Sequence, residues 1–338
     1  MIRFDDERTF AQALDALPQS DKTAIAAASE RQEVLTKPAG SLGRLEDIAL
    51  FMAGWQGTAL PALHKVCVAV FAGNHGVAAR GVSAFPTEVT AQMVGNFRAG
   101  GAAINQLAAA CGADLTVVAL DLNRPTGDIA HKPAMTADEC LAALNAGAAV
   151  VTPDTDLLLV GEMGIGNTTP AAALCLQAFG GSAEGWCGRG SGVDLDGVAR
   201  KIAAVESAIA VHGPHCTTPF ETLRRLGGRE IAAMAGAIMA ARMLRIPVLL
   251  DGFICCAAIA PLVAAEPGFS EHCLAGHCSA EQAHAYLLNQ FGLEPLLRLE
   301  MRLGEGSGAA MAVPLVRAAL ATHNGMATFA EAAVAGSL

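Results

Sequence analysis

The chain alternates between short apolar runs and longer segments in which apolar residues recur every three or four positions. Five stretches have the length and texture of strands: 66–71, 115–120, 157–160, 248–250 and the extended approach to Glu305 at 295–301. Helical patterns lie between or after them, at 89–110, 138–149, 169–178, 197–211, 231–244 and 309–320. Strands separated by helices in this way form right-handed crossovers and a parallel sheet. The pattern therefore predicts an α/β fold.

The two ends of the chain carry helical patterns without strands of their own. Residues 8–34 have apolar positions at helical spacing, and the last part of the chain continues an Ala- and Val-rich helix. We expect residues 1–60 and 311–338 to pack together as a small helical domain. Residues 61–310 then form a large α/β domain that carries the active site.

The composition is typical of a compact protein with much buried sheet. Of the 338 residues, 53% are hydrophobic and 16% are charged, and 36 are glycine. The net charge of −10, without any Lys/Arg-rich run, argues against nucleic acid or an anionic membrane as a partner. Aromatic residues make up only 4%, which argues against a platform for stacking bases. We therefore expect small-molecule substrates, no nucleic-acid partner and no membrane partner.

Ten cysteines have no regular spacing, which favours buried free thiols in a reducing compartment over a disulfide framework. Two His-Cys pairs, at 272–273 and 277–278, lack the spacing of a zinc site, so we expect no metal. The N-terminus has no apolar signal region, which predicts a cytoplasmic protein. The apolar stretch 246–265 is interrupted by Asp251 and two prolines, which favours a buried strand followed by a buried helix over a membrane span.

The most informative loop is RLGEGSG at 302–308. Three glycines at alternate positions let the backbone turn sharply and approach a ligand closely. Glu305 stands between them, and the helix that follows would direct its N–H groups and positive dipole end at the loop. A partly buried carboxylate there is a candidate general base, because burial raises its pKa toward the working pH. The alternative is a turn that carries a solvated glutamate.

Other glycine-rich loops also follow the predicted strands, at the edge where parallel sheets bind ligands. They are AGNHGV at 72–77, GVSAFP at 81–86, GEMGIGNTTP at 161–170 and DGF at 251–253. GRGSG at 188–192 precedes a helix that carries Lys201, a combination that suits a phosphate group. Asp251 would otherwise lie unpaired in apolar surroundings. Together the loops predict one ligand site at this edge.

Several of these residues also have a purely structural explanation. Lys201 alone is common on a solvated helix face, and His75 can simply satisfy a turn. Ser279, three residues before Gln282, has the spacing of a capping box and can be a helix N-cap. These alternatives stay open on the residues alone.

The common nucleotide-binding motifs are missing from the sequence. There is no G-x-x-x-x-G-K-[ST] segment, and the glycine runs lack the helix register and the later acidic residue of a dinucleotide fingerprint. No strand ends in paired acids with a Thr-rich loop, as in phosphoribosyltransferases that use pyrophosphorylated ribose. The residues themselves therefore indicate an enzyme that binds a phosphorylated small molecule, with Glu305 and Glu162 at its site.

Seven motifs, in order along nearly the whole chain, resemble those of one family. They are TKPAGSLGRLE (36–46), GNHGV (73–77), GVSAFPTEVTAQM (81–93), GEMGIGNTTPAAA (161–173), PVLLDGF (247–253), HCSAEQ (277–282) and RLGEGSGAA (302–310). The family is nicotinate-nucleotide:dimethylbenzimidazole phosphoribosyltransferase, of cobalamin lower-ligand synthesis. The fourth and seventh motifs are highly specific to it.

The resemblance implies transfer of the 5-phosphoribosyl group of nicotinate mononucleotide to a nitrogen of 5,6-dimethylbenzimidazole. Nicotinate leaves, and α-ribazole 5′-phosphate forms with inversion at the anomeric carbon. Glu305 matches the family's catalytic base, and Glu162 is similar to a second acidic group near the ribose or the base. The nucleotide- and phosphate-binding positions that the resemblance implies are Gly164, Gly166, Asn167, Thr168, Gly190, Lys201, Asp251 and Ser279. It implies no cofactor and no metal, since no pyrophosphate leaves.

The resemblance also identifies a base pocket, in which this chain departs from some members. The implied base-binding positions are Phe85, Pro86, Met93, Met163 and Leu303. Some members carry Ser, Gln and Leu in place of Phe85, Met93 and Met163, so the pocket here is more apolar and polarizable. Related bases, including phenols, therefore stay open as substrates. Asn74 replaces an Asp of other members, which weakens any acidic role there.

For the fold, the resemblance implies a Rossmann-like parallel sheet with helices on both faces and a small helical domain from both chain ends. It also implies a homodimer. Two other functions stay open at this point. One is a non-catalytic nucleotide or corrinoid-pathway sensor on the same fold, and the other is a hydrolase that releases nicotinate to water with the same glutamate. Nicotinate release that requires the base distinguishes transfer from both.

Overall fold

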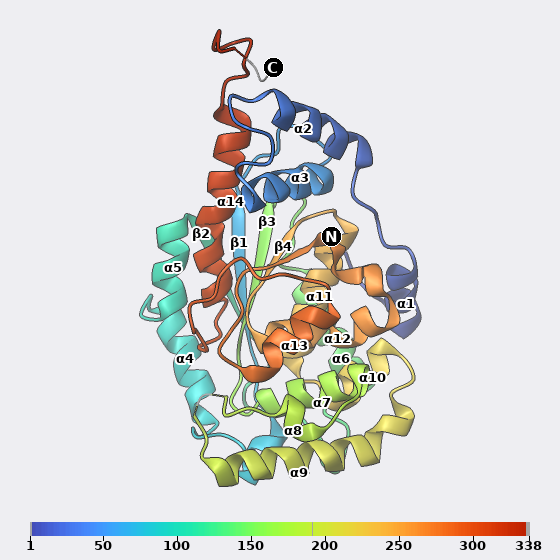
Figure 1. Cartoon of the computed structure of the whole chain (residues 1–338). Coiled ribbons are helices and arrows are strands. Elements are labelled where there is room, and N and C mark those ends of the chain that lie inside the picture. Colours follow the sequence, from blue (N-terminus) through green and yellow to red (C-terminus); the bar gives the residue numbers. More distant parts are fainter. Residues whose placement is uncertain (1, 191, 336–338) are drawn as a thin grey trace.

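A five-stranded parallel sheet forms the centre of the molecule (Figure 1). The computed structural model describes residues 2–190 and 192–335. The strands are β1 (Val66–Ala72), β2 (Ala113–Ala119), β3 (Leu157–Met163), β4 (Val248–Leu250) and β5 (Cys273–Ala275), in the spatial order β2-β1-β3-β4-β5. Every pairing between neighbouring strands is parallel. The predicted α/β fold with a parallel sheet is therefore confirmed.

Helices connect the strands and extend both ends of the chain. Those before β3 are α1 (Glu7–Asp15), α2 (Lys22–Val34), α3 (Arg44–Gln56), α4 (Glu88–Arg98), α5 (Ala103–Cys111) and α6 (Ala137–Ala148). Those after β3 are α7 (Thr168–Phe179), α8 (Ala183–Trp186), α9 (Leu195–His212), α10 (Pro219–Leu226), α11 (Arg229–Met243), α12 (Phe253–Ala265), α13 (Gln282–Gln290) and α14 (Ser307–Gly325). Short 3₁₀ turns lie at Gly76–Arg80, Gly213–His215 and Pro267–His272.

The two faces of the sheet are covered by different helices. Along β1, Val66, Val68 and Val70 pack into a core with residues of α3, α5 and α14. The alternate residues Ala69 and Phe71 pack into a second core with residues of α7, α11 and α12. Successive side chains of a strand point to opposite faces, so a strand covered on both faces is apolar throughout. This is why the strands appear in the sequence as unbroken apolar runs.

Three sequence-based predictions of local structure are corrected. Residues 295–301 are not a strand: Leu297 forms only an isolated bridge, and the fifth strand is β5, whose three residues are too few to show a pattern. The predicted helix at 89–110 is two helices, because the chain turns at Gly100, where φ is 78°. Ser279 is not a helix cap, since α13 follows Glu281 and has no side-chain cap bond.

The terminal helices pack in two places. α2 and α3 pack together, and α3 also packs along α14. The Arg31 side chain of α2 donates a hydrogen bond to the carbonyl of His323 in α14 (2.8 Å). In α1, by contrast, Phe10 and Leu14 lie in the core with α10 and α11. The division into a small helical and a large α/β domain stays a prediction, and residues 336–338 lie outside the described part.

The cysteines and the apolar stretch behave as the sequence predicts. All ten cysteines are free thiols. Residues 246–265 contain β4 followed by α12, both largely buried. None of the described helices combines the length and the apolarity needed to cross a membrane. In the same part of the chain, no group of three or more His, Cys, Asp or Glu side chains is placed to hold a metal ion.

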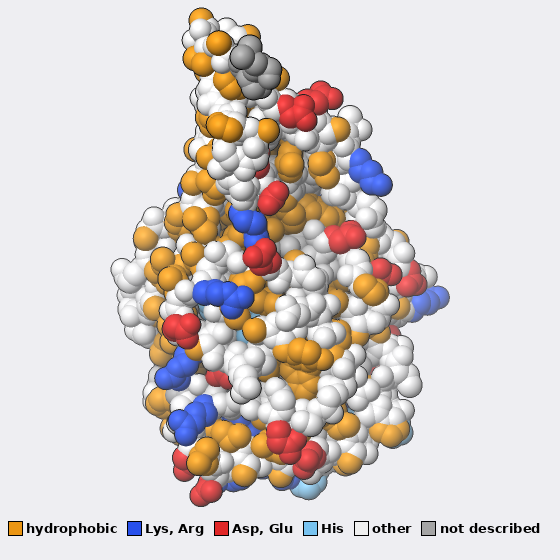
Figure 2. Space-filling view, in the orientation of Figure 1, with side chains coloured by type: hydrophobic (Ala, Val, Ile, Leu, Met, Phe, Trp, Pro, Cys, Tyr) orange, Lys and Arg blue, Asp and Glu red, His pale blue; other side chains and the backbone are white. Residues whose placement is uncertain are grey.

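Charge is scattered over the surface. On the face in Figure 2, acidic and basic side chains are interspersed among apolar and uncharged ones. This face offers no extended basic surface of the kind that binds the phosphates of a nucleic acid.

Candidate active site

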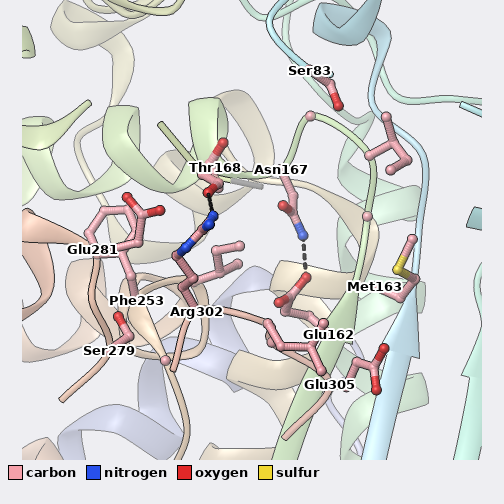
Figure 3. Close-up of a pocket in the computed structure, with 18 of the residues that line it drawn as sticks. Ser83, Glu162, Met163, Asn167, Thr168, Phe253, Ser279, Glu281, Arg302 and Glu305 are labelled. Atoms are coloured by element: carbon pink, nitrogen blue, oxygen red, sulfur yellow. Dashed lines mark hydrogen bonds between the residues drawn. The ribbon is translucent and has the colours of Figure 1, made fainter. Parts of the chain in front are cut away.

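A cavity of about 370 Å³ opens at the carboxyl ends of the central strands. Its wall consists of the loops after β1, β3 and β4, the segment after β5, and the RLGEGSG loop before α14. In Figure 3, Ser83 and Met163 lie on one side, Thr168 and Arg302 on the other, and Glu162 between them. Open parallel sheets bind their ligands at this edge, so the cavity is where the glycine-rich loops predict the site.

Glu305 is held in the wall of this cavity by an unusual backbone. It is a non-glycine residue with a φ of 64°, and its neighbours Gly304 and Gly306 have φ of 87° and 81°. The loop lies directly on β3, because a Cβ at Gly161 would overlap the Glu305 backbone. The side chain is 5% exposed, and its Oε2 accepts a hydrogen bond from the N–H of Ile104 near the start of α5 (3.4 Å). The glycines therefore place a buried carboxylate where the sequence predicts a general base.

Burial is the main cause of a raised pKa at Glu305, because it disfavours the charged form. The hydrogen bond from Ile104 lowers the pKa, and the negative charge of Asp251 raises it again. A carboxylate with a raised pKa is a stronger proton acceptor than a solvated one, as a general base requires.

Asp251 supports the loop from behind. Its Oδ2 accepts a hydrogen bond from the N–H of Gly306 (3.2 Å), and its Oδ1 accepts one from the N–H of Ala309 (2.9 Å). The residue is buried, and it receives the free N–H groups of the first turn of α14. Asp251 is not unpaired: it fixes the position of the helix start and of Glu305.

Glu162 is the second buried carboxylate of the cavity, at the end of β3. Its Oε2 accepts a hydrogen bond of 2.5 Å from the Asn167 side-chain amide (Figure 3). Burial, together with three neighbouring carboxylates, raises the pKa of Glu162 to about 8, although the hydrogen bond from Asn167 acts in the opposite direction. Those carboxylates belong to Glu230, Asp251 and Glu305. At neutral pH Glu162 is therefore mainly protonated.

The end of the cavity away from Met163 carries two cationic side chains, those of Lys201 and Arg302. Lys201 of α9 is only 2% exposed, and its Nζ donates to the Gly188 carbonyl (3.1 Å). Burial lowers its pKa, and the nearby Glu281 charge raises it. The Arg302 guanidinium donates to the Gly190 carbonyl (3.2 Å). Within the described residues, no carboxylate lies within 4 Å of the Lys201 ammonium, so a buried cation is available for an anionic group.

Thr168 and Ser279 also line the cationic end. Thr168 is the first residue of α7, whose N-terminus faces the cavity, and the preceding Gly166 has a φ of 90°. Such a helix start suits a phosphate. The Ser279 hydroxyl is paired with Nδ1 of the buried His284 (3.0 Å). Ser191, in the same glycine-rich segment as Gly190, lies outside the described residues.

The side of the cavity nearest α4 is mainly apolar. Its apolar side chains are Val82, Phe85, Val89, Met93, Met163 and Leu303. Its polar side chain is Ser83, whose hydroxyl accepts a hydrogen bond from the N–H of Phe85 (3.2 Å). Val89 and Met93 stand four residues apart on one face of α4. Phe85 and Leu303 are 50% and 57% exposed, whereas both methionines pack into the core below α14. This arrangement offers a flat aromatic ligand an apolar, adaptable surface.

Every site residue predicted from the sequence lines this one cavity, except Pro86 and Asp251. A direct ligand contact for those two stays a prediction. Four polar lining residues were assigned no role from the sequence: Ser83, His277, Glu281 and Arg302. All four lie within the GVSAFPTEVTAQM, HCSAEQ and RLGEGSGAA motifs, so the motifs contained the signal. Val89 was also missed, although its helical spacing to Met93 was visible.

Comparison with known protein families assigns the chain to a family. A family model described as phosphoribosyltransferase matches residues 17–334. The chain belongs to this phosphoribosyltransferase family. A nicotinate-nucleotide–dimethylbenzimidazole phosphoribosyltransferase of Novosphingobium aromaticivorans is 65% identical over 338 residues, 100% of each chain. One of Cereibacter sphaeroides is 58% identical over 326 residues, 96% of each chain.

The fold of this chain agrees with a solved structure. The crystal structure of CobT from Thermus thermophilus matches with a TM-score of 0.87 and 41% identity, over 93% of this chain and 100% of that chain. The Rossmann-like sheet with helices on both faces is therefore confirmed, and the chain is an enzyme, a transferase of this family.

Gly304 tests how closely the Glu305 loop is fitted to Glu162. A Cβ there would collide with the Glu162 carboxylate, in addition to the strain of a side chain at a φ of 87°. We expect Gly304→Ala to lower turnover by roughly 10²-fold, the typical cost of a 1 Å misplacement. Gly292→Ala is the matched control, since Gly292 has a φ of 65° and no atom within 4 Å of its added Cβ.

Both variants should lose thermal stability, because a side chain in the left-handed region is strained. Only Gly304→Ala should lose turnover, measured by release of nicotinate from nicotinate mononucleotide. Equal turnover in the two variants would show that the loop is not constrained by Glu162.

Proposed function

We propose that this phosphoribosyltransferase transfers the 5-phosphoribosyl group of nicotinate mononucleotide to a nitrogen of 5,6-dimethylbenzimidazole or a related base. The products are nicotinate and α-ribazole 5′-phosphate. One observation carries the proposal: a single cavity has a buried cationic end, an apolar side, and two buried carboxylates between them. The names of its relatives from Novosphingobium aromaticivorans and Cereibacter sphaeroides support the same two substrates.

The cationic end suits the 5′-phosphate. The Lys201 ammonium and the Arg302 guanidinium supply positive charge, and the start of α7 at Thr168 supplies backbone N–H groups. A phosphate bound there directs the ribose toward Glu162, which lies between the cationic and apolar parts of the wall, and Glu305 lines the same cavity. The anomeric carbon is then held close to the base, which removes much of the entropic cost of the reaction.

The apolar side suits the benzimidazole, and Glu305 supplies its chemistry. One ring nitrogen attacks the anomeric carbon as the bond to nicotinate breaks, and the nicotinate ring leaves as a neutral pyridine without an acid catalyst. The attacking ring gains positive charge, so its other nitrogen must lose its proton. The Glu305 carboxylate accepts that N–H proton as the general base. A Glu305 that is already protonated cannot do this, so turnover falls as the pH falls through its raised pKa.

Glu162 has a different role, because it is mainly protonated at neutral pH. A neutral carboxyl group donates a hydrogen bond through its O–H, here toward the ribose or the leaving nicotinate. Two carboxyl groups in one site, one ionised and one protonated, divide the base and donor roles between them. No residue of this scheme needs a cofactor to act.

We place this reaction in the assembly of the cobalamin nucleotide loop, in the cytoplasm. Ten free thiols support a reducing compartment, because disulfides do not persist there. We also propose a homodimer. The edge strand β2 supports it, since several of its residues are exposed and its outer edge has no partner strand among the described residues.

The proposed base role of Glu305 is tested by Glu305→Gln. The change keeps the shape of the side chain and removes its ability to accept a proton. We expect turnover, measured as nicotinate release in the presence of dimethylbenzimidazole, to fall by roughly 10²–10⁴. Binding of nicotinate mononucleotide, measured by calorimetry, should stay within a few-fold of the wild type. Glu300→Gln is the control, because Glu300 is exposed and does not line the cavity. Near-wild-type turnover of Glu305→Gln would remove Glu305 from the mechanism.

The apolar side predicts relaxed choice among bases. Phe85, Met93 and Met163 offer no hydrogen bond that a poorly matched base would leave unpaired. Apolar fit separates ligands by about 1–3 kcal/mol per methylene-sized group, roughly 10- to 200-fold. In a competition assay with equal amounts of dimethylbenzimidazole, benzimidazole, adenine and p-cresol, dimethylbenzimidazole should lead by such factors. A preference over benzimidazole beyond about 10⁴ would contradict this account and indicate a polar contact.

The homodimer is tested by the mass of the protein in solution. Light scattering on the purified enzyme should give twice the 34.4 kDa of one chain. The mass of a single chain at the concentrations used for turnover would contradict the proposal.

A further inference from the structure

Behind the cavity wall lies a buried carboxylate that the transfer chemistry does not use. Glu230 is the second residue of α11 and is 0% exposed. Its carboxylate lies between Gly73, which follows β1, and Gly164, which follows β3. A Cβ at either glycine would collide with one of its oxygens. Gly73 and Gly164, just after two central strands, thus leave the space that this carboxylate occupies.

The only ionisable side chain paired with Glu230 among the described residues is His75, from the GNHGV motif. Its Nε2 lies 2.5 Å from Glu230 Oε1, and both side chains are fully buried. The second oxygen of Glu230 and Nδ1 of His75 have no hydrogen-bond partner in the described structure. A buried acid with one partner and a free oxygen is costly to fold. Such an arrangement requires a use beyond stability.

Glu230 lies directly behind the cavity wall at Gly164. The position of a Cβ added to Gly164 lies 2.6 Å from Glu230 Oε1 and 2.9 Å from the Asn167 amide nitrogen. That amide donates to Glu162 (Figure 3). The Glu230 carboxylate and the Asn167–Glu162 hydrogen bond therefore both lie close to Gly164.

Three acidic groups face Glu162 from three elements. Glu230 does so from α11, Asp251 from the end of β4, and Glu305 from the loop before α14. The Asn167 amide opposes them by its hydrogen bond to Glu162. Two histidines lie beside the acids: His75 beside Glu230, and His277, whose Nε2 lies 3.5 Å from Asp251. Of the three acids, Glu230 neither lines the cavity nor holds the Glu305 loop.

We propose that Glu230, held by His75, is a positioning residue for the transfer reaction: its buried carboxylate behind Gly164 disfavours a second negative charge on Glu162, so that Glu162 keeps its proton. The proposal rests on the proposed function. The protonated Glu162 then donates its O–H while Glu305 remains ionised and accepts the proton of the base. One carboxylate outside the cavity thus maintains the difference in protonation state between the two carboxyl groups inside it.

The pH dependence of kcat/KM for nicotinate mononucleotide gives the readout. At low pH the rate falls because Glu305 takes up a proton, and at high pH it falls because Glu162 loses its proton. The pKa of Glu162 is about 8, raised first by burial and next among the charges by Glu230. Removing the Glu230 charge stabilises the ionised form of Glu162, so the proton leaves at lower pH.

The variant is Glu230→Gln, which keeps the side-chain shape and removes the charge. In this variant, the fall of kcat/KM at high pH should occur roughly one pH unit lower than in the wild type. A shift of this size is at the lower end of what one nearby charge does to the pKa of a carboxyl group. In the Glu162→Gln variant, this fall of kcat/KM at high pH should be absent, because a glutamine side chain does not ionise in this pH range. Adding Glu230→Gln in that background should then leave the shape of the profile unchanged.

Glu221→Gln is the matched control. It changes the net charge by the same amount, and its carboxylate pairs with Arg224 and Arg225 on α10, outside the cavity wall. Its profile should coincide with that of the wild type. Thermal unfolding of each variant checks that the fold is intact.

Should Glu230→Gln fail to fold, Glu230→Leu makes the same test. It also removes the charge, and it fills the buried space with an apolar side chain, so the high-pH limb should again move down. A reduced rate with an unmoved high-pH limb would overturn the proposal, as would an equal shift in the Glu162→Gln background. A wild-type enzyme that releases no nicotinate in the presence of the base would instead overturn the proposed function.

Discussion

The active site depends on the burial of four carboxyl groups at the carboxyl edge of the sheet. In the described structure none of them pairs with a lysine or arginine. Asp251 is held by N–H groups at the start of α14, Glu305 by an N–H near the start of α5, and Glu162 by an amide. Glu230 is held by a histidine. Without cations nearby, burial and mutual repulsion decide which groups keep a proton.

The glycines of the sequence are what make this burial possible. Gly161 lets the Glu305 backbone lie on β3, Gly304 leaves room for the Glu162 carboxyl group, and Gly73 and Gly164 leave room for Glu230. A single methyl group at any of these positions would push a carboxyl group out of place. The cations stand at the other end of the cavity, at Lys201 and Arg302, away from the acids. The glycines of the backbone thus allow the acidic groups to be buried in one part of the cavity while the basic groups lie in another.

The sequence predicted the sheet because β1, β2 and β3 are seven residues long and mostly apolar. It missed β5, because its three residues stand between His272 and Gly276 and not in a longer apolar run. The glycine loops predicted the edge of the sheet at which the cavity opens, and Glu305 is a candidate because of its place between glycines. The support from Asp251 could not be predicted, since its partners lie 55 and 58 positions along the chain. Glu230 has no local signal either, because it begins a helix that is buried all round.

We expect the enzyme to transfer the phosphoribosyl group to a bound base and not to water. Chromatography of nicotinate mononucleotide incubated with the enzyme, with and without dimethylbenzimidazole, tests this. Nicotinate should be released only when the base is present, with one α-ribazole 5′-phosphate formed for each nicotinate released. Release at the same rate without the base, or none with it, would show that the proposed transfer is wrong.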